Sequence, residues 1–171
     1  MSTIDAEKII ETQRQSWDSV APAWDKWDKN LEQSLTFVSY RLIGDARICP
    51  GQRVLDLGCG TGYPSILAAQ AVGSKGTVVG LDLSENMLAV ARRKAEESGV
   101  KNISYQAKDV TSLSYDAASF DAVISRFCLM FLPDIHGALK EIARVLKKGG
   151  YFSAAVWSTP DKNPFIRIPM E

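Results

Sequence analysis

A glycine-rich run at residues 54–62, Val-Leu-Asp-Leu-Gly-Cys-Gly-Thr-Gly, is the part of the sequence best suited to hold a ligand. It connects a short apolar stretch, predicted as a strand, to a stretch rich in Ala, Ile and Leu, predicted as a helix. Glycines at such a junction permit a tight turn and let a ligand lie against bare backbone. Because residue 63 is tyrosine, the dinucleotide fingerprint G-x-G-x-x-G fails at its third glycine. The run also fits a plain tight turn.

Three carboxylates end or follow three successive predicted strands. Asp56 lies within the glycine run, Asp82 follows the second strand and Asp109 the third. A carboxylate at the position of Asp82 can accept hydrogen bonds from a ribose diol, and Asp109 can accept the exocyclic amine of adenine. Turn and capping roles are the alternatives. Acidic groups repel a pyrophosphate and favour a ligand with hydroxyls, amines and a positive charge.

The elements that must position these carboxylates alternate along the chain. Strands are predicted over residues 53–57, 76–81, 102–106, 120–125 and 151–157, and helices over residues 63–72, 84–98 and 134–147. This alternation predicts a doubly wound, Rossmann-like α/β fold with a mostly parallel sheet and helices on both faces. The carboxyl ends of its strands line one crevice, where ligands bind.

The first 50 residues are predicted to form a helical cap or lid, followed by a core over residues 51–171. Pro22 is expected to break the helical pattern, and a second helix is predicted over residues 31–48. Aromatic side chains in this segment either pack against the sheet or form a lid over an apolar pocket. These are Trp17, Trp24, Trp27, Phe37 and Tyr40.

Composition excludes several classes of function. The chain has 171 residues, and its 20 Lys and Arg balance its 20 Asp and Glu. Nucleic-acid binding normally needs a basic excess, so we expect no nucleic-acid partner and no stable membrane anchoring. The three cysteines are widely spaced, which predicts free thiols in a reducing cytoplasm and no metal site.

Five motifs, in order, resemble those of class I S-adenosylmethionine-dependent methyltransferases. They lie at residues 54–62, 79–87, 108–110, 120–126 and 146–151. The resemblance is to the branch that includes the ubiquinone and menaquinone biosynthesis methyltransferases. It implies that the chain binds S-adenosyl-L-methionine, methylates a small apolar or aromatic acceptor by in-line transfer, and releases S-adenosyl-L-homocysteine.

The resemblance also implies roles for individual residues. Asp82 takes the ribose hydroxyls, and Asp109 takes the adenine amine. Asp56 and Gly58 face the amino-acid part of the cofactor, over which Trp24 closes. The full set assigned to the cofactor is Trp24, Asp56, Gly58, Gly60, Asp82, Leu83, Met87, Asp109, Val110 and Ser125.

The catalytic residues are not identified by the sequence. Ser125, Arg126 and His136 are candidates near the acceptor, although His136 lies off the apolar face of its helix and is expected to be exposed. Cys128 follows the fourth predicted strand, where cytosine C5-methyltransferases place a thiolate, but it lacks their Pro-Cys pair. A buried, inert thiol is the commoner role for such a residue.

The chain departs from the family after its fifth predicted strand. The remaining residues are too few for the last two strands of the seven-stranded family sheet, so we expect a truncated form or fragment with an open fifth strand. A second copy, forming a homodimer, or the C-terminal tail could cover this edge. The alternatives are a truncated or non-catalytic S-adenosylmethionine-binding domain, a nicotinamide-dependent oxidoreductase and a nucleic-acid methyltransferase. The sequence lacks the Tyr-x-x-x-Lys pair that would support the oxidoreductase. It also lacks, after the fourth predicted strand, the Asn/Asp-Pro-Pro-aromatic motif that would support the nucleic-acid methyltransferase.

Overall fold

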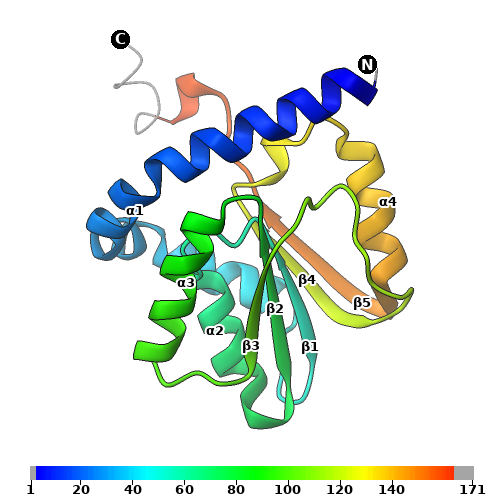
Figure 1. Cartoon of the computed structure of the whole chain (residues 1–171). Coiled ribbons are helices and arrows are strands. Elements are labelled where there is room, and N and C mark those ends of the chain that lie inside the picture. Colours follow the sequence, from blue (N-terminus) through cyan, green and yellow to red (C-terminus); the bar gives the residue numbers. More distant parts are fainter. Residues whose placement is uncertain (1–2, 164–171) are drawn as a thin grey trace.

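A computed structural model describes residues 3–163 as a parallel sheet flanked by helices, with one long helix across the carboxyl ends of its strands (Figure 1). The helices are α1 (Thr3–Asp45), α2 (Tyr63–Val72), α3 (Glu85–Glu97) and α4 (Ile135–Val145), with short 3-10 helices η1 (Gly73–Lys75), η2 (Leu129–Phe131) and η3 (Pro160–Lys162). The strands are β1 (Arg53–Leu57), β2 (Thr77–Asp82), β3 (Ile103–Ala107), β4 (Phe120–Arg126) and β5 (Leu146–Ala155). Within the described residues the sheet has the order β3-β2-β1-β4-β5.

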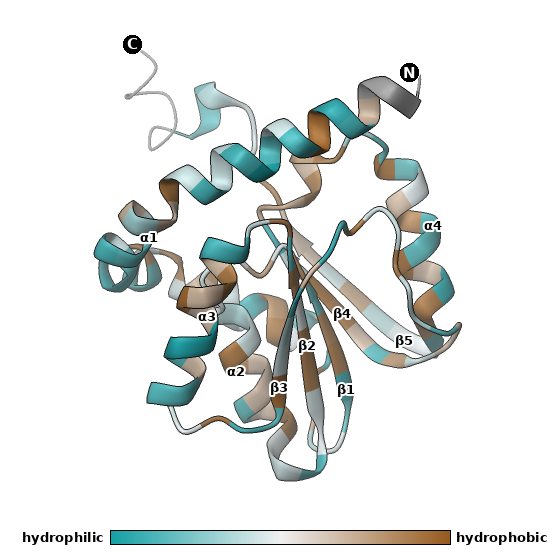
Figure 2. Ribbon diagram, in the orientation of Figure 1, coloured by the Kyte–Doolittle hydropathy of each residue, from teal (hydrophilic) through white to brown (hydrophobic). Residues whose placement is uncertain are grey.

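Alternate residues of the central strands pack against helices on opposite faces of the sheet. Leu55 and Leu57 join the apolar cluster under α4, whereas Val54 joins the cluster under α2. Apolar residues predominate in the central strands β1, β2 and β4, whereas the helices contain many hydrophilic residues (Figure 2). Burial of both faces of the sheet explains why apolar residues predominate in these strands. The predicted doubly wound α/β fold is confirmed.

The predicted break at Pro22 is wrong, because α1 continues through it from Thr3 to Asp45. Proline has no N–H to donate to the carbonyl four residues earlier, which belongs to Asp18. The side-chain amide of Asn86, at the start of α3, donates to that carbonyl at 3.2 Å. A tertiary contact thus replaces the missing helical hydrogen bond.

The boundary between α4 and β5 also differs from the prediction. The helix ends at Val145 rather than near residue 147, and the residues before the predicted start of the strand already belong to β5. The face of α4 that packs on the sheet contains Ala138 and Ile142, whereas Ile135 and Leu139, which lie at helical spacing from Ile142 in the sequence, are 40% and 39% exposed. The helix is therefore rotated relative to the periodicity that the sequence indicated.

Strand β5 is at one edge of the sheet and pairs only with β4 among the described residues. This agrees with the expected open edge, while association through it stays a prediction. The tail that was considered as a cover, residues 164–171, lies outside the described residues. Over the part of the chain that the structure covers, no helix is long and apolar enough to span a membrane.

Candidate functional site

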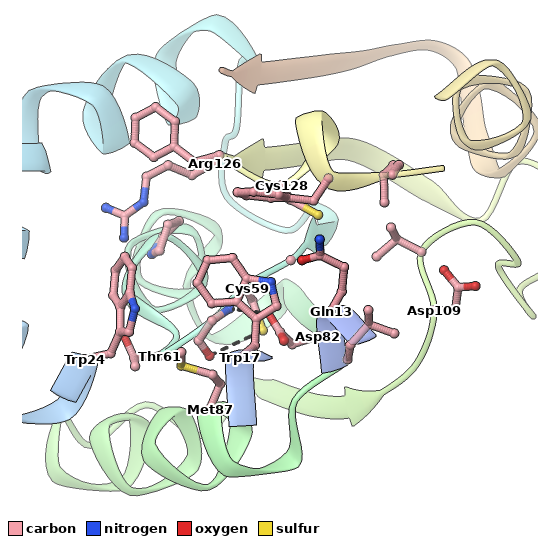
Figure 3. A pocket seen from close by; sticks show the side chains of 18 of the residues that line it. Gln13, Trp17, Trp24, Cys59, Thr61, Asp82, Met87, Asp109, Arg126 and Cys128 are labelled. Carbon is pink, nitrogen blue, oxygen red and sulfur yellow. Dashed lines mark hydrogen bonds between the residues drawn. The ribbon is translucent and has the colours of Figure 1, made fainter. Parts of the chain in front are cut away.

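A pocket lies between α1 and the loops that follow the carboxyl ends of the strands. Its floor is the turn between β1 and α2, in which Gly58, Gly60 and Gly62 all have positive φ, between 53° and 87°. The turn enters α2 directly at Tyr63, with Pro64 in its first turn. The side chains that line the pocket point toward one another from both of its sides (Figure 3).

Asp82 ends β2 and joins the glycine turn to the start of α3. One carboxylate oxygen accepts the Gly60 N–H at 2.8 Å, and the other accepts the Ser84 N–H at 2.9 Å. Burial raises the pKa of Asp82, and these backbone hydrogen bonds oppose the shift. Because a carboxylate has about four acceptor positions, Asp82 can still accept ligand hydroxyls while it orders the turn.

Asp109 lines the pocket beyond β3. Its two oxygens accept the backbone N–H of Thr111 at 2.8 Å and the hydroxyl of Thr111 at 2.6 Å. The turn role considered for this aspartate is therefore present, and it fixes the orientation of the carboxylate. Leu83, Met87 and Val110, which the resemblance assigns to the cofactor, also line the pocket.

Asp56 lies beneath the pocket and is fully buried rather than among the residues that line it. One of its oxygens accepts the Ser65 hydroxyl, and the other has no partner among the described residues. Burial raises the pKa of Asp56 from 3.8 to about 6, although the hydrogen bond from Ser65 and the charge of Arg126 lower it. An unpartnered buried carboxylate oxygen is costly and favours protonation.

We expect Asp56→Asn to remove a pH-dependent cost to folding. As pH rises, the Asp56 carboxyl loses its proton at a lower pH in the unfolded chain than in the folded protein. The free energy of unfolding therefore falls as pH rises from about 4 to about 7. The shift corresponds to about 3 kcal/mol at pH 7. Urea unfolding should therefore show similar stability of the two proteins at pH 4 and a variant more stable by about 3 kcal/mol at pH 7. An equal difference at both pH values would contradict this origin.

The three residues expected near the acceptor lie in different places. Arg126 lines the pocket, whereas Ser125 is buried and donates its hydroxyl to the Leu57 carbonyl at 3.0 Å, between β4 and β1. His136 is exposed at the start of α4 and is not among the pocket residues. Of the three, only Arg126 has direct access to a ligand in the pocket.

Aromatic rings form part of the pocket wall. Trp17 of α1 packs edge-on against Phe131, with ring centroids 5.4 Å apart, and also lies 6.2 Å from Trp24. Phe127 stacks on Trp157 with centroids 4.1 Å apart. Trp24, which the resemblance assigns to the cofactor, lines the pocket, and so do Phe127 and Trp157, which were not expected there. This wall suits a planar, apolar ligand.

Helix α1 is held over the pocket by acidic residues that the sequence analysis did not identify. Asp18 accepts the Ser84 hydroxyl at 2.6 Å, Asp25 pairs with Arg93, Asp28 pairs with Lys94 at 2.6 Å, and Glu32 pairs with Arg126. The available signal was their spacing of seven, three and four residues, which places them on one helical face. Because a break was expected at Pro22, these acidic residues were not recognised as one face of a single helix.

The two thiols at the pocket are not nucleophiles. Burial and the neighbouring charge of Asp82 raise the pKa of Cys128 to about 12, and the pKa of Cys59 rises for the same reasons. Both therefore stay protonated near neutral pH. The structure gives Cys128 no means of acting as a thiolate.

The pocket fits an adenosyl sulfonium compound better than a phosphate or a metal ion. The Gly60 N–H, which could have met a phosphate, is taken by Asp82, and Asp82 and Asp109 repel anions. These carboxylates can accept a diol and an amine, and their negative charge favours a cation. In the described part of the chain, no group of three or more His, Cys, Asp or Glu side chains could hold a metal ion.

Comparisons with known proteins give a consistent result. Residues 54–150 match a family described as a methyltransferase domain. The aklanonic acid methyltransferase DauC of Streptomyces sp. strain C5 is 39% identical over 124 residues, which cover 72% of this chain and 56% of that protein. A demethylmenaquinone methyltransferase of Staphylococcus epidermidis is 44% identical over 118 residues, covering 69% of this chain and 48% of that protein.

A solved structure has the same arrangement. The S-adenosylmethionine-dependent methyltransferase of Aquifex aeolicus superposes with a TM-score of 0.66 at 26% identity, covering 74% of this chain and 68% of that one. The chain spans about half the length of the two curated relatives above.

Proposed function

Because the chain belongs to the class I S-adenosylmethionine-dependent methyltransferases, we propose that it methylates a small apolar or aromatic acceptor. The observation that carries this proposal is the pocket itself, which is lined both by the carboxylates of Asp82 and Asp109 and by several aromatic rings. Relatives named for demethylmenaquinone and aklanonic acid support an acceptor of this class.

The cofactor, when bound, supplies a methyl group that is already electrophilic, so the residues of the chain mainly bind, orient and exclude water. We assign the ribose hydroxyls to Asp82 and the adenine to Asp109, Leu83 and Val110. The aromatic wall that contains Trp17 and Phe131 would hold the acceptor and keep water away from the reacting atoms. Transfer would form a bond between the methyl carbon and a nucleophilic atom of the acceptor as the carbon–sulfur bond breaks, S-adenosylhomocysteine would leave, and the proton that the acceptor loses would pass to solvent.

The proposal is tested by incubating the protein with S-adenosylmethionine labelled in its methyl group and reduced demethylmenaquinone. We expect label in the acceptor and one S-adenosylhomocysteine for each methyl group transferred. The variant Phe131→Ala tests the acceptor wall. We expect it to raise the acceptor KM about tenfold through the loss of ring contacts, with little change in cofactor affinity.

Cofactor binding without transfer to any quinone or aromatic acid in a panel would favour the alternative, a non-catalytic cofactor-binding domain. We further propose a cytoplasmic location, which the free thiols of Cys49, Cys59 and Cys128 support. Association of two copies through the edge of β5 is also a proposal, supported by the open edge and testable by sedimentation.

A further inference from the structure

We propose that Arg126 is the carboxylate-binding residue of the pocket and takes the carboxylate at the amino-acid end of the cofactor. This inference rests on the proposed function and adds a residue role to it. The argument depends on how Arg126 is held, which of its donors are free, and where it lies relative to Asp82 and Asp109.

Arg126 ends β4, and α1 fixes its guanidinium from above. Its two terminal nitrogens donate to the two oxygens of Glu32 at 2.9 and 3.1 Å, and one also donates to the Ser39 hydroxyl at 2.8 Å. The side chains of Arg126 and Glu32 are each 9% exposed. A fork geometry held from one side leaves little freedom to the guanidinium, which is therefore preorganised.

These contacts use three of the five N–H donors of the guanidinium. Within residues 3–163, the Nε–H and one Nη2–H of Arg126 have no hydrogen-bond partner. Arg126 nevertheless lines the pocket, beside the Tyr63 ring, whose centroid is 5.9 Å from the guanidinium carbon. Nε–H and one terminal N–H are the pair of donors that a carboxylate can accept together.

The order of the strands places this cation at the correct end of the pocket. Asp109 follows β3 and Asp82 follows β2, the glycine turn follows β1, and Arg126 ends β4, in the order β3-β2-β1-β4 across the sheet. An adenosyl group that reaches both carboxylates must extend its other end across the glycine turn toward β4. The pocket therefore has carboxylate acceptors where the ligand has hydroxyl and amine groups, and the free N–H donors of Arg126 where the ligand has its carboxylate.

The test compares two adenosyl ligands, of which only one carries the amino-acid end with this carboxylate. S-adenosylhomocysteine has it, and 5′-methylthioadenosine lacks the amino-acid end. Calorimetry of wild-type protein should show tighter binding of S-adenosylhomocysteine, and Arg126→Gln should reduce this preference at least tenfold by weakening that ligand alone. Because Arg126→Gln leaves Glu32 buried without its partner, the double variant Arg126→Gln/Glu32→Gln provides the same test in a neutral site.

Glu32→Gln is the matched control, since it retains Arg126 and should retain the preference for S-adenosylhomocysteine. An unchanged preference in both arginine variants would overturn the inference while leaving the proposed function intact. A further titration compares 2-naphthoate with 2-naphthamide on protein saturated with S-adenosylhomocysteine. If the arginine variants weaken only the binding of 2-naphthoate, Arg126 binds a carboxylate of the acceptor and the assignment to the cofactor is wrong. Failure of folded wild-type protein to bind either adenosyl ligand would overturn both proposals.

Discussion

Replacing Gly58 with alanine is expected to cost about 2–5 kcal/mol of folding stability and to abolish cofactor binding. An added Cβ would lie 2.4 Å from the Cβ of Cys128 and 2.5 Å from its sulfur. The backbone at Gly58 also has φ of +66°, a conformation that costs a residue with a side chain about 1 kcal/mol or more. Relief of the overlap must move the turn or the segment after β4, both of which line the pocket.

The matched control is Gly99→Ala, just after the C-terminal end of α3 and outside the pocket. Gly99 has nearly the same φ, +68°, but a Cβ added there meets nothing within 4 Å. Urea unfolding should therefore show a loss of about 1 kcal/mol for this variant, with the affinity for S-adenosylhomocysteine unchanged. Equal losses of stability at the two positions would mean that the crowding at Cys128 does not exist in the folded protein.

Asp82→Ala is expected to weaken the binding of S-adenosylhomocysteine at least about 30-fold, or about 2 kcal/mol. Hydrogen bonds to a charged group contribute about 1.5–3 kcal/mol each, and the substitution removes those to the ribose hydroxyls. It also releases the Gly60 and Ser84 N–H groups that Asp82 accepts. Isothermal titration calorimetry at constant pH measures the change in affinity.

Asp134→Ala separates binding from folding in this comparison. Asp134 also accepts a backbone N–H, that of Gly137 at 2.9 Å, at the start of α4, but it does not line the pocket. Its loss should cost about 1 kcal/mol of stability and leave the dissociation constant within about twofold of the wild-type value. An Asp82→Ala protein that binds as tightly as Asp134→Ala would show that Asp82 serves only the turn.

The parts of the site that depend on local sequence could be predicted. The glycine turn, Asp82 and Asp109 each follow a strand whose apolar run is visible in the sequence, and parallel strands bring their carboxyl ends together. The start of the helix predicted over residues 84–98 also depends on local sequence, since the Ser84 hydroxyl accepts the N–H of Met87 three residues later.

The parts that depend on long-range contacts could not be predicted. Asn86 supplies the hydrogen bond that lets α1 pass Pro22, and it is 68 residues from its partner Asp18. Glu32 and Arg126 are 94 residues apart. Nothing local indicates that these residues meet, because their pairing depends on where α1 crosses the sheet. Ser125 was placed at the pocket, but its hydroxyl bonds to the neighbouring strand instead.

The central claim is that the pocket beyond β1, β2 and β3 binds an adenosyl sulfonium compound. Calorimetric titration of the folded chain with S-adenosylmethionine and with S-adenosylhomocysteine tests it most directly. We predict saturable binding of one ligand per chain, with dissociation constants below about 100 µM that rise at least about 30-fold in Asp82→Ala. Absence of binding by folded protein at ligand concentrations of about 10 mM, far above such a constant, would contradict the account.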